Sequence, residues 1–153
     1  MTTTPTLSWG IKDSLLAYIG RIEDGLIETS AGATREGDEF QFSFDEAASS
    51  FDVDSSEGVL QFRGSVIITG HWGSMRVEIH DPRLTLVAGS GDLATSTKSV
   101  FGDDRVEAFA NVNLTTPAPT LTATTALTAA GRMLMGQQYN VGQELNPLQV
   151  IWK

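Results

Sequence analysis

The sequence of 153 residues contains no cysteine and only two histidines, His71 and His80. The lack of cysteine excludes disulfides, thiolate metal sites, thioether attachment of a cofactor and a cysteine nucleophile. Two histidines cannot supply the three protein ligands of a catalytic zinc site, so such a site would also need a carboxylate ligand. Any bound metal must therefore use histidine, tyrosine or carboxylate ligands.

Positive charge is also scarce, because 10 lysines and arginines stand against 19 aspartates and glutamates, a formal net charge of −9. The basic residues are scattered singly, and a negative surface repels polyphosphate, so we expect no nucleic-acid partner. Apolar runs extend for only a few residues, far short of the roughly 20 that a membrane helix needs. We therefore expect no membrane insertion.

The amino terminus, residues 1–5, lacks the basic and apolar regions of a secretory signal. As written, the sequence predicts a cytoplasmic protein, and an exported domain without its leader would look the same. A chain of this length can bury a core without a disulfide or a metal. We expect one domain over residues 1–153, with residues 1–6 disordered.

Apolar residues three or four apart predict one helix near the amino terminus, because this spacing forms a buried helical stripe. The stripe runs from Leu7 to Ile22, and Ser8 is a candidate N-cap. Gly20 and Gly25 bracket the end, since glycine adopts a left-handed cap readily. The prediction is a helix over residues 9–20.

Most of the remaining chain alternates apolar and polar residues, which is typical of half-buried strands. Residues 40–44 form one such strand, and residues 59–71, rich in β-branched side chains, form the strongest. Gly70 and Gly73 permit a tight bend into residues 75–79, which predicts a hairpin. Further predictions are strands at 84–88, 106–114 and 148–152, a loop or edge at 115–125, and a second helix at 127–138.

One helix, six or more strands and a short helix near the end predict a mainly β (α+β) fold. The architecture is either β-sandwich-like or an open barrel carrying helical lids, and periodicity does not distinguish the two.

The roles of Tyr18 and His71 stay open on pattern alone. Tyr18 lies four residues after Ser14, so both side chains project from one helix flank, where a tyrosine ordinarily packs at the core edge. His71 stands between glycines, where a satisfied turn histidine is the ordinary interpretation. No G-x-S-x-G elbow supports nucleophilic catalysis, and the acidic turn at 52–57 does not match an EF-hand loop.

Three blocks of the sequence resemble the HtaA domain, a bacterial module that captures haem at the cell surface. Residues 7–19 are similar to the family's W-G-x-x-x-S-x-x-x-Y helix. Residues 62–73, followed by 79–83, are similar to its G-x-V-x-F-x-G-H-x-G strand pair closing on D-P-R. Residues 127–131 and 139–148 are similar to its L-T-x-x-G and Y-x-x-G-x-x-L-x-P ending.

The resemblance implies a protein that binds ferric haem b and is not an enzyme. In the family the helix tyrosine is the axial iron ligand and the strand histidine hydrogen-bonds to it, which corresponds to Tyr18 and His71 here. Ser14 occupies the position associated with a haem propionate, and Tyr139 that of a pocket tyrosine. Expected partners are haem and other haem carriers or transporters, the family location is usually exported or at the cell surface, and a homo-oligomer remains open.

Two alternatives also remain open. Gln138 stands where the family commonly has an aromatic residue, so one stacking surface over the porphyrin is missing. The first alternative is therefore a β-sandwich interaction module that does not bind haem. A haem-dependent peroxidase or catalase is the other, since catalases also use tyrosinate ligation. Such an enzyme needs a distal acid–base group, for which His80 is the only remaining histidine.

Overall fold

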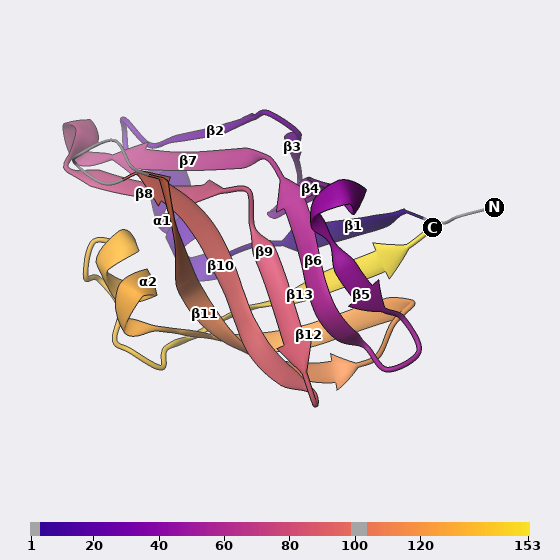
Figure 1. Cartoon of the computed structure of the whole chain (residues 1–153). Coiled ribbons are helices and arrows are strands. Elements are labelled where there is room, and N and C mark those ends of the chain that lie inside the picture. The colour runs from indigo at the N-terminus through magenta and orange to yellow at the C-terminus, as the bar shows by residue number, and fades with distance from the viewer. Residues whose placement is uncertain (1–3, 99–103) are drawn as a thin grey trace.

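The structure is a computed structural model that describes residues 4–98 and 104–153. Figure 1 shows a β-rich molecule with both termini at one end and the helices α1 and α2 toward the other. The helical elements are α1 (Asp13–Arg21), α2 (Ala129–Leu134) and two 3-10 turns, η1 (Glu46–Ala48) and η2 (His71–Gly73). The strands are β1 (Pro5–Trp9), β2 (Leu26–Ser30), β3 (Ala33–Glu36), β4 (Glu39–Phe44), β5 (Ser50–Asp52), β6 (Glu57–Arg63), β7 (Ser65–Gly70), β8 (Met75–His80), β9 (Arg83–Val87), β10 (Ser90–Lys98), β11 (Asp104–Thr116), β12 (Thr120–Leu127) and β13 (Glu144–Trp152).

Eight strands form a barrel. They hydrogen-bond in the order β4-β1-β13-β12-β11-β10-β9-β6, and a pairing between β4 and β6 completes the ring. Strands β3 and β5 extend this sheet beside β4 and β6, while β2, β7 and β8 form a separate three-stranded sheet. The predicted mainly β class is confirmed, and of the two predicted architectures the structure has the barrel.

The barrel interior is filled by alternate side chains of its strands, because neighbouring strand residues point to opposite faces. Trp9 and Phe109 meet edge to face, with ring centroids 5.8 Å apart and planes at 86°. The Trp9 indole Nε1 donates to the Asn146 carbonyl oxygen at 2.7 Å, so the buried polar atom of the tryptophan is satisfied. The largest fully buried aromatic side chains are Trp9, Phe40, Phe42, Phe62 and Phe109.

The first helix begins at Asp13, later than predicted, because residues 5–9 form β1 between β13 and β4. Leu7 is therefore buried by strand alternation, and the stripe from Leu7 to Ile22 is not a single helix. The buried residues of β1, which alternate, are followed by the buried face of α1 at a spacing that continues the same apolar pattern. Ser8 is not the N-cap, and the helix continues through Gly20 to Arg21.

The start of the chain also differs from the expected disorder over residues 1–6. Residues 5 and 6 are strand, with Pro5 opposite Trp152 in the ladder to β13. The Thr4 backbone N–H donates to the Lys153 carbonyl at 3.2 Å, which extends the ladder by one residue. Residues 1–3 lie outside the described residues.

The long strand predicted over 59–71 is wrong, because it is two strands of different sheets, β6 and β7. They meet at Gly64, whose φ of +139° is rarely adopted by residues with side chains. A Cβ there would lie 2.6 Å from the Ala33 backbone nitrogen, so only glycine fits. The predicted hairpin from β7 through η2 to β8 is confirmed.

Two further barrel strands were missed by the sequence patterns, which predicted no strand between residues 88 and 106 and a loop or edge at 115–125. Strand β10 occupies residues 90–98, and β12 begins at Thr120. Both are rich in threonine, serine and alanine, so they contain few of the large apolar residues that mark a strand. The second helix, α2, is shorter than the predicted 127–138 and ends at Leu134.

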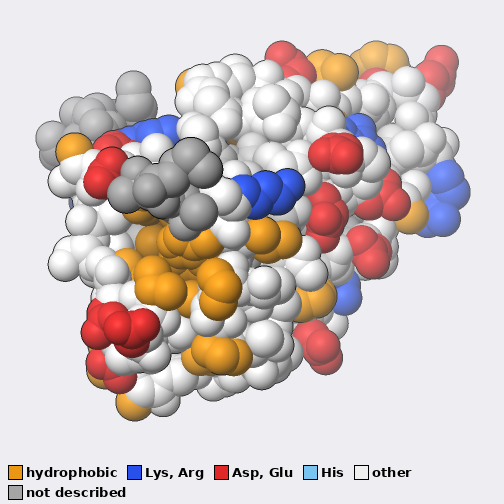
Figure 2. All heavy atoms as spheres, turned by 90° about the vertical axis from the view of Figure 1, so that its right-hand side faces the viewer, with side chains coloured by type: hydrophobic (Ala, Val, Ile, Leu, Met, Phe, Trp, Pro, Cys, Tyr) orange, Lys and Arg blue, Asp and Glu red, His pale blue; other side chains and the backbone are white. Residues whose placement is uncertain are grey.

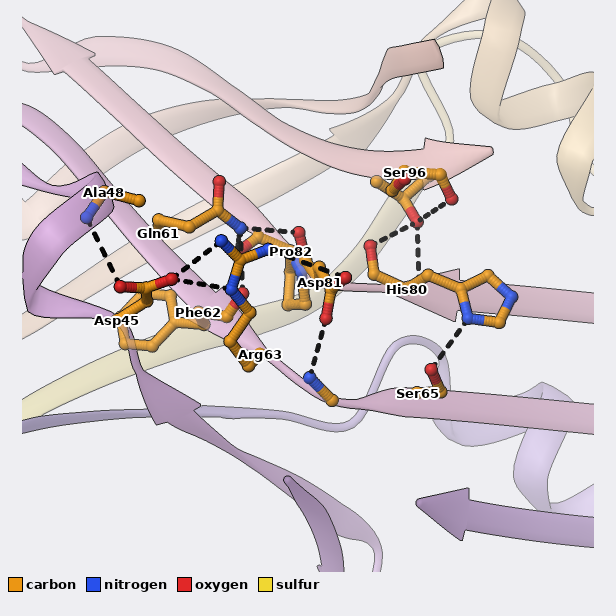
Figure 3. A network of polar contacts seen from close by, with 12 residues as sticks. Asp45, Ala48, Gln61, Phe62, Arg63, Ser65, His80, Asp81, Pro82 and Ser96 are labelled. Carbon is orange, nitrogen blue, oxygen red and sulfur yellow. Dashed lines mark hydrogen bonds and ion pairs between the residues drawn. The ribbon is translucent and has the colours of Figure 1, made fainter. Parts of the chain in front are cut away.

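An ion-pair network lies at the junction where β4 and β6 close the barrel (Figure 3). The Arg63 guanidinium donates to Asp45 Oδ2 from Nη2 at 2.7 Å and from Nε at 2.8 Å, and its Nη1 is 3.6 Å from Asp81 Oδ2. The hydrogen bond from Arg63 holds the pKa of Asp45 below its usual value.

We expect Asp45→Asn to lower the denaturation temperature at neutral pH and to have little effect in acid. The folded pKa of Asp45 is lowered, so its contribution is fully present above the unfolded pKa and is lost as the pH falls through the folded pKa. Thermal denaturation of wild type and variant between about pH 7 and about pH 2 measures this. Asp38→Asn is the control, because Asp38 is exposed and its ion pair with Arg35 is long, with 4.0 Å between Oδ1 and Nη2, and therefore weak. A difference independent of pH would contradict the assignment.

Candidate functional site

Tyr18 and His71 meet at the end of the molecule opposite the chain termini. Tyr18 is half-buried on α1, and its hydroxyl is hydrogen-bonded to Nε2 of His71, which lies 53 residues further along the chain. The ring centroids are 5.6 Å apart with the planes inclined at 45°. The contact joins a phenol hydroxyl to an imidazole nitrogen, and which of the two donates depends on the histidine tautomer.

The start of α1 is held to the barrel by Asn146 in β13. The Asp13 backbone N–H donates to Asn146 Oδ1 at 3.0 Å, and Asn146 Nδ2 donates to Asp13 Oδ1 at 2.6 Å. The Asn146 backbone N–H also donates to the Ile11 carbonyl at 2.9 Å. Gly10 permits this approach, since a Cβ there would lie 2.7 Å from Asn146 Nδ2. The helix that carries Tyr18 is therefore fixed at its first turn.

The turn that carries His71 has an uncommon backbone. His71 and Trp72 have φ of 51° and 56°, in the left-handed region that non-glycine residues seldom enter. The Trp72 side chain is 83% exposed. Asp24, in the connection after α1, accepts a hydrogen bond from the backbone N–H of each of these two residues.

A hollow of about 290 Å³ lies beside Tyr18, near the lower end of the range typical of ligand pockets. Ser14, one turn before Tyr18 on α1, has its Oγ 3.4 Å from the Tyr139 hydroxyl at the edge of this hollow. The site thus combines a phenol paired to an imidazole, two further hydroxyls and apolar walls. The lining residues are Leu15, Tyr18, Met75, Gln138 and Tyr139.

The structure brings the four sequence-predicted site residues together as two pairs, Tyr18 with His71 and Ser14 with Tyr139. Leu15 falls within the predicted apolar stripe and Met75 begins the predicted strand at 75–79, and the structure adds that both line the hollow. Asp24 was missed. No local pattern marks it, because its partners lie 47 and 48 residues away.

His80 lies elsewhere, in a polar cluster on the three-stranded sheet. Figure 3 shows the His80 ring in contact with the Ser65 side chain. The His80 Nδ1 is 2.8 Å from Ser65 Oγ, and its Nε2 is 2.9 Å from Glu78 Oε1. The pKa of Glu78 is lowered, chiefly by a hydrogen bond from Arg76. Both ring nitrogens of His80 therefore have protein partners. Across residues 4–98 and 104–153, no group of three or more His, Cys, Asp or Glu side chains is arranged to hold a metal ion.

A larger hollow, of about 500 Å³, lies at the opposite end of the molecule. Figure 2 shows hydrophobic side chains gathered on that face, and within the hollow Phe51 and Trp152 stack with centroids 5.7 Å apart. Its lining contains none of the predicted site residues, and the one titratable side chain in that lining is Glu46. We place the functional site at the smaller hollow because the ligand-type groups converge there.

Comparisons with known proteins agree with this fold. The family model described as Htaa matches residues 4–151. The N-terminal domain of HtaA from Corynebacterium glutamicum is 24% identical, with a TM-score of 0.81 over 100% of this chain and 98% of that one. The C-terminal domain of the same protein is 23% identical, with a TM-score of 0.79 over 97% and 95%. The heme binding protein HtaB from that organism is 21% identical, with a TM-score of 0.74 over 99% and 94%. No curated protein matches the sequence.

None of the helices that the structure describes is long and apolar enough to cross a bilayer.

Proposed function

The chain belongs to the HtaA family, and on that premise we propose that it binds ferric haem non-covalently, with the Tyr18 phenolate as the axial iron ligand. The observation that carries the proposal is the hydrogen bond between Tyr18 and His71 beside an apolar hollow. The heme-binding relative HtaB, which shares the fold, supports the choice of ligand.

The residues of the site fit haem in chemistry. When bound, haem supplies a ferric iron with an axial position and a flat apolar ring. An anionic oxygen is a suitable ligand for ferric iron, as in the tyrosinate-ligated haem of catalase. Leu15 and Met75 offer apolar surface, and Met75 adapts readily to the shape of its neighbours.

His71 makes the Tyr18 oxygen available as an anion. A phenol ligates only after its proton leaves, and His71 Nε2 is already hydrogen-bonded to the Tyr18 hydroxyl to receive that proton. The imidazolium then donates a hydrogen bond back to the phenolate and stabilises its charge. This arrangement holds a ligand rather than driving a reaction, which is what capture, transport or transfer of haem between carriers requires.

Ser14 and Tyr139 supply hydroxyl groups at the edge of the same hollow. Their oxygens lie 3.4 Å apart, close enough to donate together to one carboxylate. A chain with a formal net charge of −9 repels a dianionic ligand at long range, so local donors of this kind matter. We propose that they contact a haem propionate.

Titration of the purified chain with hemin tests the proposal. We expect a high-spin ferric tyrosinate spectrum and saturation at one haem per chain. His71→Ala removes a hydrogen bond to a charged group, which contributes about 1.5–3 kcal/mol, so haem affinity should fall by about 10- to 100-fold. His80→Ala is the matched control and should leave the affinity unchanged, because His80 lines a different hollow. Equal affinity of wild type and His71→Ala would exclude the proposed role.

The peroxidase alternative depends on His80 acting as a distal acid–base group. Its ring nitrogens are bonded to Ser65 and Glu78, and it does not line the hollow beside Tyr18. The holoprotein is therefore expected to turn over peroxide no faster than free hemin.

A further inference from the structure

Asp24 connects the helix of Tyr18 to the turn of His71. Asp24 Oδ1 accepts from the His71 backbone nitrogen at 3.1 Å, and Oδ2 accepts from the Trp72 backbone nitrogen. We propose that Asp24 is a positioning residue that clamps this turn and thereby holds the His71 imidazole on the Tyr18 hydroxyl. The inference rests on the proposed function, because holding His71 on the Tyr18 hydroxyl matters for haem only if Tyr18 is the iron ligand.

Two hydrogen bonds from Ser74 to the His71 carbonyl, from the backbone N–H at 3.1 Å and from Oγ at 2.8 Å, hold the end of the turn, and Asp24 holds its start. Two consecutive residues with side chains are held in the left-handed region, which is unfavourable for L-residues. Both side chains are exposed, Trp72 at 83%, so apolar burial does not hold the turn in place. The ladder between β7 and β8 ends at Gly70 and Met75, before the turn begins. The Asp24 carboxylate satisfies both N–H groups that this backbone directs toward α1.

The chain after α1 is built so that Asp24 reaches the turn. Gly25 allows the backbone to double back on the helix, since a Cβ there would lie 2.0 Å from the Ile19 carbonyl oxygen. Gly70 allows the hairpin to approach, since a Cβ there would lie 2.5 Å from Ile22 Cδ1. Tyr18 and Asp24 are thus on one continuous segment, which folds back on α1 at Gly25 and packs closely against the hairpin at Gly70.

The clamp makes the position of His71 depend on the same segment that carries Tyr18. If α1 shifts, Tyr18 and Asp24 shift together, and the imidazole follows because its own backbone is bonded to Asp24. Loss of the carboxylate frees the turn while leaving both Tyr18 and His71 present. Asp24→Ala should therefore act on haem binding only through His71.

The test uses Asp24→Ala, Asp24→Asn, His71→Ala and the Asp24→Ala/His71→Ala double variant. In the apoprotein, hydrogen exchange of the His71 and Trp72 amides should be roughly tenfold faster in Asp24→Ala, because a charge-assisted hydrogen bond is lost. In the holoprotein, haem dissociation should accelerate by roughly tenfold. Asp24→Asn keeps one acceptor oxygen and should fall between wild type and Asp24→Ala in both measurements.

The double variant separates positioning from general structure. It should lose haem no faster than His71→Ala alone, because Asp24 acts through His71. Asp52→Ala is the control. Asp52 also accepts a hydrogen bond from a backbone N–H, that of Asp54 at 2.9 Å, but in the turn between β5 and β6. Additive losses in the double variant, or unchanged amide exchange in both Asp24 variants, would overturn the inference. If neither the wild type nor any variant binds haem, the proposed function fails. The amide exchange rates still decide whether Asp24 clamps the turn.

Discussion

Tyr18→Phe should abolish the tyrosinate spectrum of the hemin complex and lower haem affinity by more than about 100-fold. Substitution of residues that merely support a metal ligand already costs about 10- to 100-fold, and this change removes the ligand oxygen itself. Phenylalanine keeps the half-buried ring on α1, so the hollow beside Leu15 should keep its shape. Visible absorption and a competitive hemin titration measure the two effects.

Tyr139→Phe is the matched control for that result. It removes the chain's only other tyrosine hydroxyl, which contacts Ser14 Oγ at 3.4 Å, whereas the hydroxyl bonded to His71 is that of Tyr18. We expect the ferric tyrosinate spectrum to persist in Tyr139→Phe, with affinity reduced by about tenfold or less, since a neutral hydrogen bond contributes about 1 kcal/mol. An unchanged spectrum in Tyr18→Phe, or its loss in Tyr139→Phe alone, would remove Tyr18 as the ligand.

Trp9→Ala should destabilise the fold by about 3–5 kcal/mol, the usual cost of truncating a large buried aromatic. Trp9 is 0% exposed, packs edge to face on Phe109 and donates its indole N–H to the Asn146 carbonyl. The truncation leaves a cavity and removes one of the two hydrogen bonds to the Asn146 carbonyl, which also accepts from the Thr125 hydroxyl at 2.7 Å. Urea denaturation of the apoprotein measures the loss.

Trp72→Ala provides the control for this second prediction. The Trp72 side chain is 83% exposed, so its removal should change the free energy of unfolding by no more than about 0.5 kcal/mol. Comparable losses for Trp9→Ala and Trp72→Ala would mean that Trp9 does not anchor the barrel. If only Trp9→Ala lowers the free energy of unfolding, and that variant still binds haem through Tyr18 at low temperature, then Trp9 stabilises the fold without contributing to the iron bond.

Much of the fold could be predicted because alternation of apolar residues reports directly on half-buried strands. Strand β4 and the hairpin of β7 and β8 were predicted in this way. Prediction failed where local pattern and tertiary pairing conflict. Residues 7–9 continue the stripe of α1 yet pair with β13, and Gly64 divides the run of β-branched and apolar residues at 59–71 between two sheets. The threonine-rich strands β10 and β12 lie in the ring because both neighbours supply ladder bonds, which no single strand sequence reveals.

The candidate site divides in the same way. Sequence by itself determined the inventory: no thiol, two histidines, two tyrosines, and motif blocks that single out Tyr18 and His71. Spacing along the chain left both residues with ordinary packing roles. Only the tertiary structure decided that their polar atoms meet across 53 residues, and that Asp24 bonds the backbone of the histidine turn. The reason is physical: strand and helix periods act over neighbouring residues, whereas these hydrogen bonds depend on how the hairpin packs against the end of α1.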